Sequence, residues 1–155
     1  MESTNKPNSD ASINVFLIGN NPIELSSVYE KLLNIQSNIF KAEIGFEFNG
    51  LFKKIKRFNP SCILIDDNIE RIQIKKILKK LTHNSLTRHI PVTVLKNSNY
   101  NEGFSEAQDY LLKNDLTSEK LTKSILNTIR LRRMQLFVIK KYRKNRSLFM
   151  SLFEN

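Results

Sequence analysis

A carboxylate and two ammonium groups each follow directly on a short apolar run of this sequence. Asp66 follows the run SCILI, Lys96 follows PVTVL, and Lys113 follows Tyr-Leu-Leu. A carboxylate can accept a phosphoryl group or help to hold Mg²⁺, and ammonium groups neutralise the charge of a phosphate. These three residues are therefore the first candidates for chemistry.

The apolar runs are typical of buried strands, and they alternate with segments of helical periodicity. We expect strands over 13–18, 40–48, 61–65, 91–95 and 110–112, with helices over 23–33, 51–58 and 69–81. A long helix is expected to begin at Thr117 or Ser118, because either residue is a good N-cap. This alternation predicts a parallel sheet with helices on both faces, and in such sheets chemistry lies outside the carboxyl ends of the strands.

Three motifs follow one another along the chain: residues 59–66 (NPSCILID), 89–95 (HIPVTVL) and 107–113 (AQDYLLK). They resemble the third, fourth and fifth strands of the receiver domain of bacterial response regulators, the phosphorelay proteins of two-component systems. The resemblance spans residues 13–133 and implies a flavodoxin-like (βα)5 fold, doubly wound, with strand order 2-1-3-4-5 and an extended C-terminal helix. It implies a non-catalytic signal-transduction module of the cytoplasm, a phosphoprotein whose partner is a histidine kinase or a phosphotransfer protein.

The same resemblance assigns roles to individual residues. Asp66 takes the place of the phospho-acceptor, Tyr110 that of the switch aromatic, and Lys113 that of the site lysine. The paired carboxylates that hold Mg²⁺ in the family fall here on Gly19 and Asn20. This acidic pocket is therefore degenerate, and Asp66 is left as a weak candidate ligand for a doubtful Mg²⁺ cofactor.

The lysines suggest a replacement for the metal. Lys96 stands where the family has a hydroxyl residue, and we expect Lys96 and Lys113 together to clamp Asp66 in an ion-pair cluster. In the alternative, the Lys96 side chain turns out to water. Asp67 is expected to face solvent or the following loop.

Bulk composition limits the setting of the chain. Its single cysteine, Cys62, excludes an intrachain disulfide framework and favours a reducing, cytoplasmic environment. No apolar run approaches the length of about 20 residues that a membrane span needs. Residues 1–12 are small and polar, which predicts a disordered leader.

The basic character of the chain belongs to its C-terminal part. The formal net charge is +10, but residues 130–146 hold eight basic and no acidic side chains, and the remainder has 17 basic against 15 acidic ones. We expect residues 134–155 to be a basic helical linker, whose 4–3 spacing of apolar residues favours a homodimer. Residues 149–155 resemble the start of a PAS domain, which implies the N-terminal part of a receiver–PAS protein with an output domain in the same chain.

Two other functions remain open. The first is a pseudo-receiver that works without phosphorylation, as a protein-interaction or dimerisation module. The second is a DNA-binding regulator that uses the basic helix, although no nucleic-acid-binding motif supports it. A nucleotide-binding enzyme is disfavoured because no glycine-rich loop follows the first strand.

Overall fold

Five parallel strands form the centre of the computed structural model, which describes residues 12–35, 38–46, 48–97 and 103–153. They run in the order β2-β1-β3-β4-β5. The strands are β1 (Ile13–Ile18), β2 (Phe40–Gly45), β3 (Cys62–Asp66), β4 (Val92–Lys96) and β5 (Asp109–Leu112). This confirms the predicted sheet and its strand order. The proposed leader lies outside the described residues, apart from residue 12.

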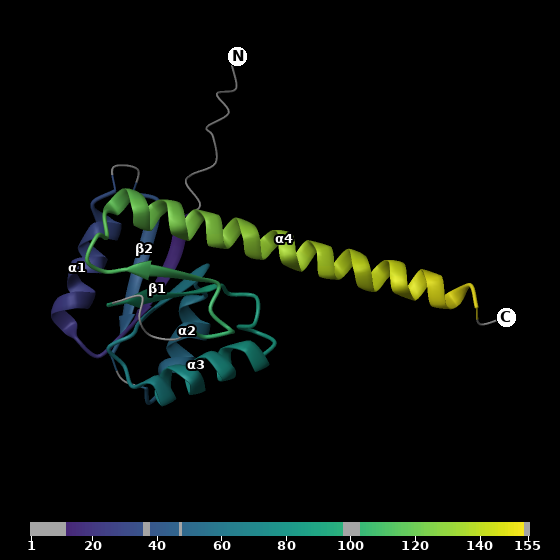
Figure 1. Ribbon diagram of the computed structural model, residues 1–155, viewed down its shortest axis with the longest axis horizontal. Helices are drawn as coiled ribbons and strands as arrows, with labels where there is room; N and C mark the ends of the chain where they lie inside the picture. The colour runs from purple at the N-terminus through teal and green to yellow at the C-terminus, as the bar shows by residue number, and fades with distance from the viewer. Residues whose placement is uncertain (1–11, 36–37, 47, 98–102, 154–155) are drawn as a thin grey trace, which may run out of the picture.

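Four helices cover the sheet (Figure 1): α1 (Pro22–Leu33), α2 (Leu51–Phe58), α3 (Arg71–His83) and α4 (Ser118–Ser151). Side chains of a strand point alternately to its two faces, so consecutive residues enter different cores. Phe16 and Ile63 pack with α2 and α3, whereas Leu17 and Leu64 pack with α1 and α4. Because both faces are covered, most side chains of the three inner strands, β1, β3 and β4, are apolar.

Local hydrogen bonding explains two of the differences between the predicted boundaries and the structure. The second strand ends at Gly45 rather than at residue 48, because its register with β1 ends at the Ile18–Gly45 pair. The third helix begins at Arg71 rather than at residue 69, because the chain first makes a turn in which Ile69 N donates to Asp66 O at 3.4 Å. This turn holds Asp66 and the residues after it at the sheet edge.

The connection between β4 and β5 is short. No helix is assigned to the part of it that the structure describes, residues 97 and 103–108. Phe104 from this connection packs into the core on the α3 side. The polar and weakly periodic sequence of residues 97–106 predicts a short helix at best, and part of it, residues 98–102, lies outside the described part.

Helix α4 begins after Thr117, whose side chain accepts a hydrogen bond from Lys120 N at 3.1 Å. Its first half packs on the sheet, and its second half projects away from the domain (Figure 1). The helix continues without a break through residue 133, where we expected the receiver-like part to end. None of the helices described is both long and apolar enough to cross a membrane.

Candidate functional site

The carboxyl ends of β1, β3 and β5 bring the candidate residues to one edge of the sheet. Asp66 is the last residue of β3, the central strand, and is 1% exposed. Lys113 follows β5, and its backbone N–H donates to Lys96 O at 3.0 Å, which extends the ladder past the end of the strand. Strand topology therefore positions the carboxylate and the ammonium opposite each other.

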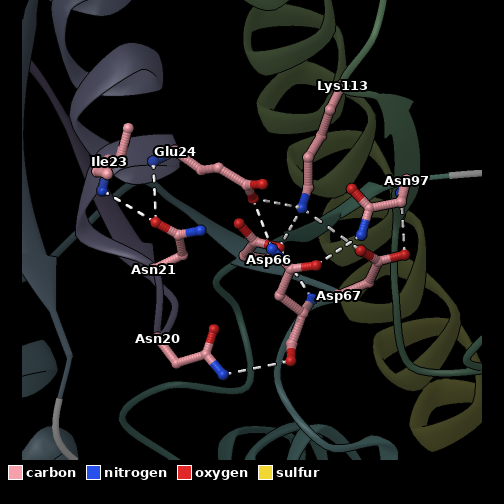
Figure 2. Close-up of polar contacts among 9 residues, drawn as sticks. Asn20, Asn21, Ile23, Glu24, Asp66, Asp67, Asn97 and Lys113 are labelled. Carbon is pink, nitrogen blue, oxygen red and sulfur yellow. Dashed lines mark hydrogen bonds and ion pairs between the residues drawn. The ribbon is translucent and has the colours of Figure 1, made fainter.

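Lys113 makes a direct ion pair with Asp66. Its Nζ donates to Asp66 Oδ1, the same oxygen that accepts from Asn68 N at 2.9 Å. Figure 2 shows the Lys113 ammonium at the centre of a group of carboxylates. The Asp66 side chain is 2% exposed and that of Lys113 is 12% exposed, so water screens this pair little.

A second carboxylate comes from Glu24, which the sequence analysis missed. Glu24 Oε2 lies 3.0 Å from Lys113 Nζ and accepts from Asn68 Nδ2 at 2.6 Å. Helix α1 brings it there, because Asn21 caps the helix and Pro22 opens it, so that Glu24 falls in the first turn beside the sheet edge. The N-cap and the acidic first turn were visible in the sequence and would have pointed to this residue.

Asp67, which was expected to face solvent or the following loop, faces Lys113 and the loop after β4. Its side chain is only 10% exposed, Oδ2 accepts from Asn97 N at 3.0 Å, and Oδ1 lies 3.5 Å from Lys113 Nζ. Asn97 also donates from Nδ2 to Asn68 Oδ1 at 2.6 Å. One lysine therefore faces three carboxylates, and two asparagines that the sequence analysis did not single out tie the loops together.

Burial and charge act against each other on these groups. Burial raises the pKa of Asp66 above its ordinary value, although the hydrogen bond from Lys113 works in the other direction. Burial also disfavours the Lys113 ammonium, but its hydrogen bonds to Asp66 and Glu24 outweigh burial and raise the pKa of Lys113. The hydrogen bond from Lys113 lowers the pKa of Glu24. The lysine is thus held in its charged form.

The pocket is altered where the resemblance places two metal-binding carboxylates. A Cβ atom on Gly19 would lie 2.8 Å from Leu25 Cδ1, so the buried Leu25 side chain fills the space of a longer residue. Asn20 donates from Nδ2 to Asn68 O at 3.2 Å (Figure 2). The Asn20 amide group and the Asn68 carbonyl group are therefore bonded to each other. Within the described ranges no group of three acidic, histidine or cysteine side chains is arranged to hold a metal ion, and the three carboxylates of this site face the Lys113 ammonium instead. The residues therefore do not fit the Mg²⁺ site that the family implies.

Of the two lysines expected around Asp66, Lys113 contacts it and Lys96 lies elsewhere. Lys96 Nζ sits over the Tyr110 ring, 5.1 Å from its centroid. The reason is strand alternation: Lys96 shares its face of the sheet with Val94, on the α3 side, whereas Asp66 shares its face with Leu64, on the α1 side.

Tyr110 is anchored by its hydroxyl group. The hydroxyl donates to Phe104 O at 2.6 Å and accepts from Phe104 N at 2.5 Å. Gly103 leaves room for this arrangement, because a Cβ atom there would lie 2.6 Å from the hydroxyl oxygen. Tyr110 is therefore packed against the α3-side core with both of its hydrogen bonds inside the domain.

The sequence matches no protein-family model and no curated protein sequence. Solved structures do match. A response regulator from Chloroflexus aurantiacus J-10-fl superposes with a TM-score of 0.65 at 15% identity, covering 77% of this chain and 98% of that one. The receiver domain of a sensor histidine kinase from Pseudomonas aeruginosa PAO1, with magnesium in its active-site cleft, gives 0.62 at 18% identity, covering 77% and 98%.

The chain has the receiver-domain fold. A response regulator receiver modulated diguanylate cyclase from Pelobacter carbinolicus shares it, with a TM-score of 0.61 at 16% identity, covering 79% of this chain and 97% of that one. Receiver domains are regulatory modules. Among the matched structures, one is the receiver domain of a sensor histidine kinase and another is a receiver modulated diguanylate cyclase. The site of this chain has Asp66 and Lys113 in contact, and it has Gly19 and Asn20 where the resemblance places metal-binding carboxylates.

Replacement of Glu24 by Gln tests how far α1 participates in the site. We expect a loss of less than about 1 kcal/mol in the free energy of unfolding, because the Glu24 side chain is 41% exposed and solvent weakens its ion pair. Because the pKa of Glu24 is lowered in the folded state, its contribution is present above the ordinary glutamate pKa and disappears as the pH falls through the folded value.

Urea titrations of the wild type and Glu24→Gln over a range of pH measure this difference. Glu30→Gln, an exposed position on the same helix, is the matched control. A Glu24→Gln deficit that does not shrink in acid would show that the ion pair with Lys113 is not its source.

Proposed function

We propose that this chain is the regulatory receiver module of a two-component signalling protein, and that its Asp66 site works without a Mg²⁺-dependent phosphorylation cycle. The receiver fold supports the first part. The observation that supports the second is the altered acidic pocket, in which Leu25 fills the space beside Gly19 and Asn20 donates a hydrogen bond to Asn68 O. Regulation then proceeds through contacts with other proteins or domains, as in a pseudo-receiver.

Electrostatics explains why such a site would hold one state. In phosphoryl transfer to a carboxylate, cations must neutralise the phosphoryl oxygens and leave the acceptor oxygen accessible. Here Oδ1 of Asp66 accepts from both Lys113 and Asn68 N. Tyr110, the candidate switch residue, has its hydroxyl bonded to Phe104. A site with these bonds satisfied resists the rearrangement that a phosphoryl group would drive.

The second candidate is an ordinary phosphorelay receiver with Asp66 as its phospho-acceptor. Its support is the location of Asp66 at the carboxyl end of the central strand, beside a lysine. In this case a histidine kinase or phosphotransfer protein is the partner, and Lys113 would move from Asp66 to the phosphoryl oxygens.

Intact-mass analysis after incubation with acetyl phosphate and Mg²⁺ separates the two candidates. We expect no phosphoryl adduct on the wild type, while a receiver with complete acidic residues gains one under the same conditions. An adduct on the wild type that is absent from Asp66→Asn would reject the pseudo-receiver and establish the phosphorelay. Circular dichroism of both proteins controls for folding.

For the organisation of the chain we propose a receiver module over 13–133 and a helical linker over 134–155 that leads to an output domain. The support is the continuity of α4 through this boundary. A continuous helix transmits a rotation or shift from the domain to whatever follows it. The buried free thiol of Cys62 suits the reducing cytoplasm that we propose as its location.

A further inference from the structure

The projecting half of α4 has an apolar stripe that the domain does not cover. Ile129 is the last buried side chain of the helix, and its projecting half (Figure 1) has large apolar side chains exposed along it. The stripe consists of Leu131, Met134, Val138, Ile139, Tyr142, Phe149, Leu152 and Phe153. At a rise of 1.5 Å per residue, the 22 residues from Leu131 to Leu152 extend over about 33 Å. Exposed apolar surface of this extent marks an interaction surface.

The spacing of the stripe is that of a coiled coil. Positions separated alternately by four and three residues from Leu131 to Leu152 give Leu131, Gln135, Val138, Tyr142, Asn145, Phe149 and Leu152. The same spacing continues backwards to Thr128, Ser124 and Leu121, which are buried against the domain. One seam thus packs on the domain in the first half of α4 and is exposed in the second.

Two polar residues in the seam indicate what kind of surface it meets. Gln135 and Asn145 are both amides, which carry a donor and an acceptor and can therefore hydrogen-bond an identical residue. In a parallel pair of identical helices in register, each amide meets its own copy. A purely apolar groove would leave these groups unsatisfied, at a cost in affinity.

The charges of the helix are arranged to leave this seam free. Arg133, Lys140, Arg143 and Lys144 fall on the opposite side at 3.6 residues per turn. Three basic residues flank the seam. Arg132 donates to Arg88 O of the domain at 2.5 Å, and Lys141 of one helix would approach Arg146 of the other. The other flanking positions are apolar, namely Met134, Ile139, Leu148 and Phe153.

We propose that the exposed seam of α4 binds a second copy of this chain as a parallel, in-register, two-stranded coiled coil. This surface lies away from the Asp66 site, and pairing does not depend on whether Asp66 is phosphorylated. Dimerisation places two receiver folds side by side at the start of one coiled coil. Because both halves of α4 use the same face, the seam continues from the domain into the coiled coil.

Sedimentation of the full chain over a range of concentrations tests the pairing. We expect a dimeric mass for the wild type and a monomeric mass for Val138→Glu/Phe149→Glu, which puts two carboxylates into the seam. The matched control is Phe137→Glu/Met150→Glu, which lies outside the seam and is expected to stay dimeric. The exposures are comparable, at 62% and 60% for the first pair and 61% and 52% for the second. A monomeric wild type, or equal behaviour of the two variants, would overturn the proposal.

Cross-linking tests the orientation. Cys62 is buried, so a cysteine introduced on α4 is the accessible thiol. In the parallel arrangement Leu131→Cys and Leu152→Cys each form a disulfide with their own copy, and Phe137→Cys does not. Cross-links that form only when Leu131→Cys and Leu152→Cys are mixed would indicate antiparallel helices and reject the proposed register.

The salt dependence of binding distinguishes a second copy of this chain from an anionic partner such as DNA or a lipid vesicle. Dimerisation is expected to tighten as salt rises, because screening weakens the repulsion between Lys141 and Arg146 of the two copies. Binding of α4 to DNA or to vesicles with anionic lipid would weaken with salt. A wild-type chain that stays monomeric but binds such vesicles or DNA at low salt would reassign the face and refute the dimer.

Discussion

Lys113→Met is expected to lower the free energy of unfolding by about 3–5 kcal/mol at neutral pH, because it leaves a buried carboxylate without its cation. Asp66 is 2% exposed and Asp67 is 10% exposed, and both lie within ion-pair distance of Lys113 Nζ. Without the ammonium these carboxylates repel each other in a poorly solvated site. Methionine preserves most of the aliphatic chain, so the loss reports on charge.

The pH dependence of this loss of stability, together with a second substitution, tests whether the buried ion pair is its cause. Removal of Lys113 raises the pKa of Asp66 further, so the deficit is expected to shrink in mildly acidic buffer as that carboxyl group takes up a proton. In Asp66→Asn/Lys113→Met part of the loss is expected to be recovered, which a double-mutant cycle in urea measures. Lys76→Met, an exposed lysine on α3, is the control for charge alone. A deficit that is the same at all pH values and additive in the cycle would contradict the buried ion pair.

Gly19→Asp is expected to destabilise the fold by about 1–3 kcal/mol, whereas Asn20→Asp is expected to stay within about 0.5 kcal/mol of the wild type. The reason is space. A Cβ atom at Gly19 would come within 2.8 Å of the fully buried Leu25, while Asn20 is exposed.

The two variants therefore differ as routes to an acidic pocket. Asn20→Asp adds a carboxylate at the sheet edge and removes the hydrogen bond to Asn68 O, so it is the variant in which an acetyl-phosphate adduct is expected to appear. Urea titration and intact-mass analysis of both variants measure stability and chemistry separately. A stable Gly19→Asp would contradict the role of Leu25 in closing the pocket. A double-mutant cycle of Gly19→Asp and Leu25→Ala tests the steric part, because Leu25→Ala makes room for the introduced side chain and its own cost is measured in the single variant.

The sheet and its order follow from local patterns in the sequence. Apolar runs that end at Gly19, Asp66, Lys96 and Lys113 mark the strands, and the motifs in residues 59–66 and 107–113 carried the resemblance to a receiver. The long last helix was also predictable from its N-cap and its apolar spacing. These features are encoded within short stretches, where hydrophobic period and capping residues act over a few positions.

The partners of Asp66 were decided by tertiary structure. The sequence brought Lys113 into consideration, but Glu24, Asn68 and Asn97 joined the site only through the packing of α1 and the loops at the sheet edge. The direction of Lys96 depended on which face of β4 it occupies, and the burial of Asp67 depended on a hydrogen bond from Asn97 N. Residue types and order thus determined that a carboxylate and a lysine would meet. Which further groups reach them depends on distances between elements far apart in the chain, and local sequence does not fix those distances.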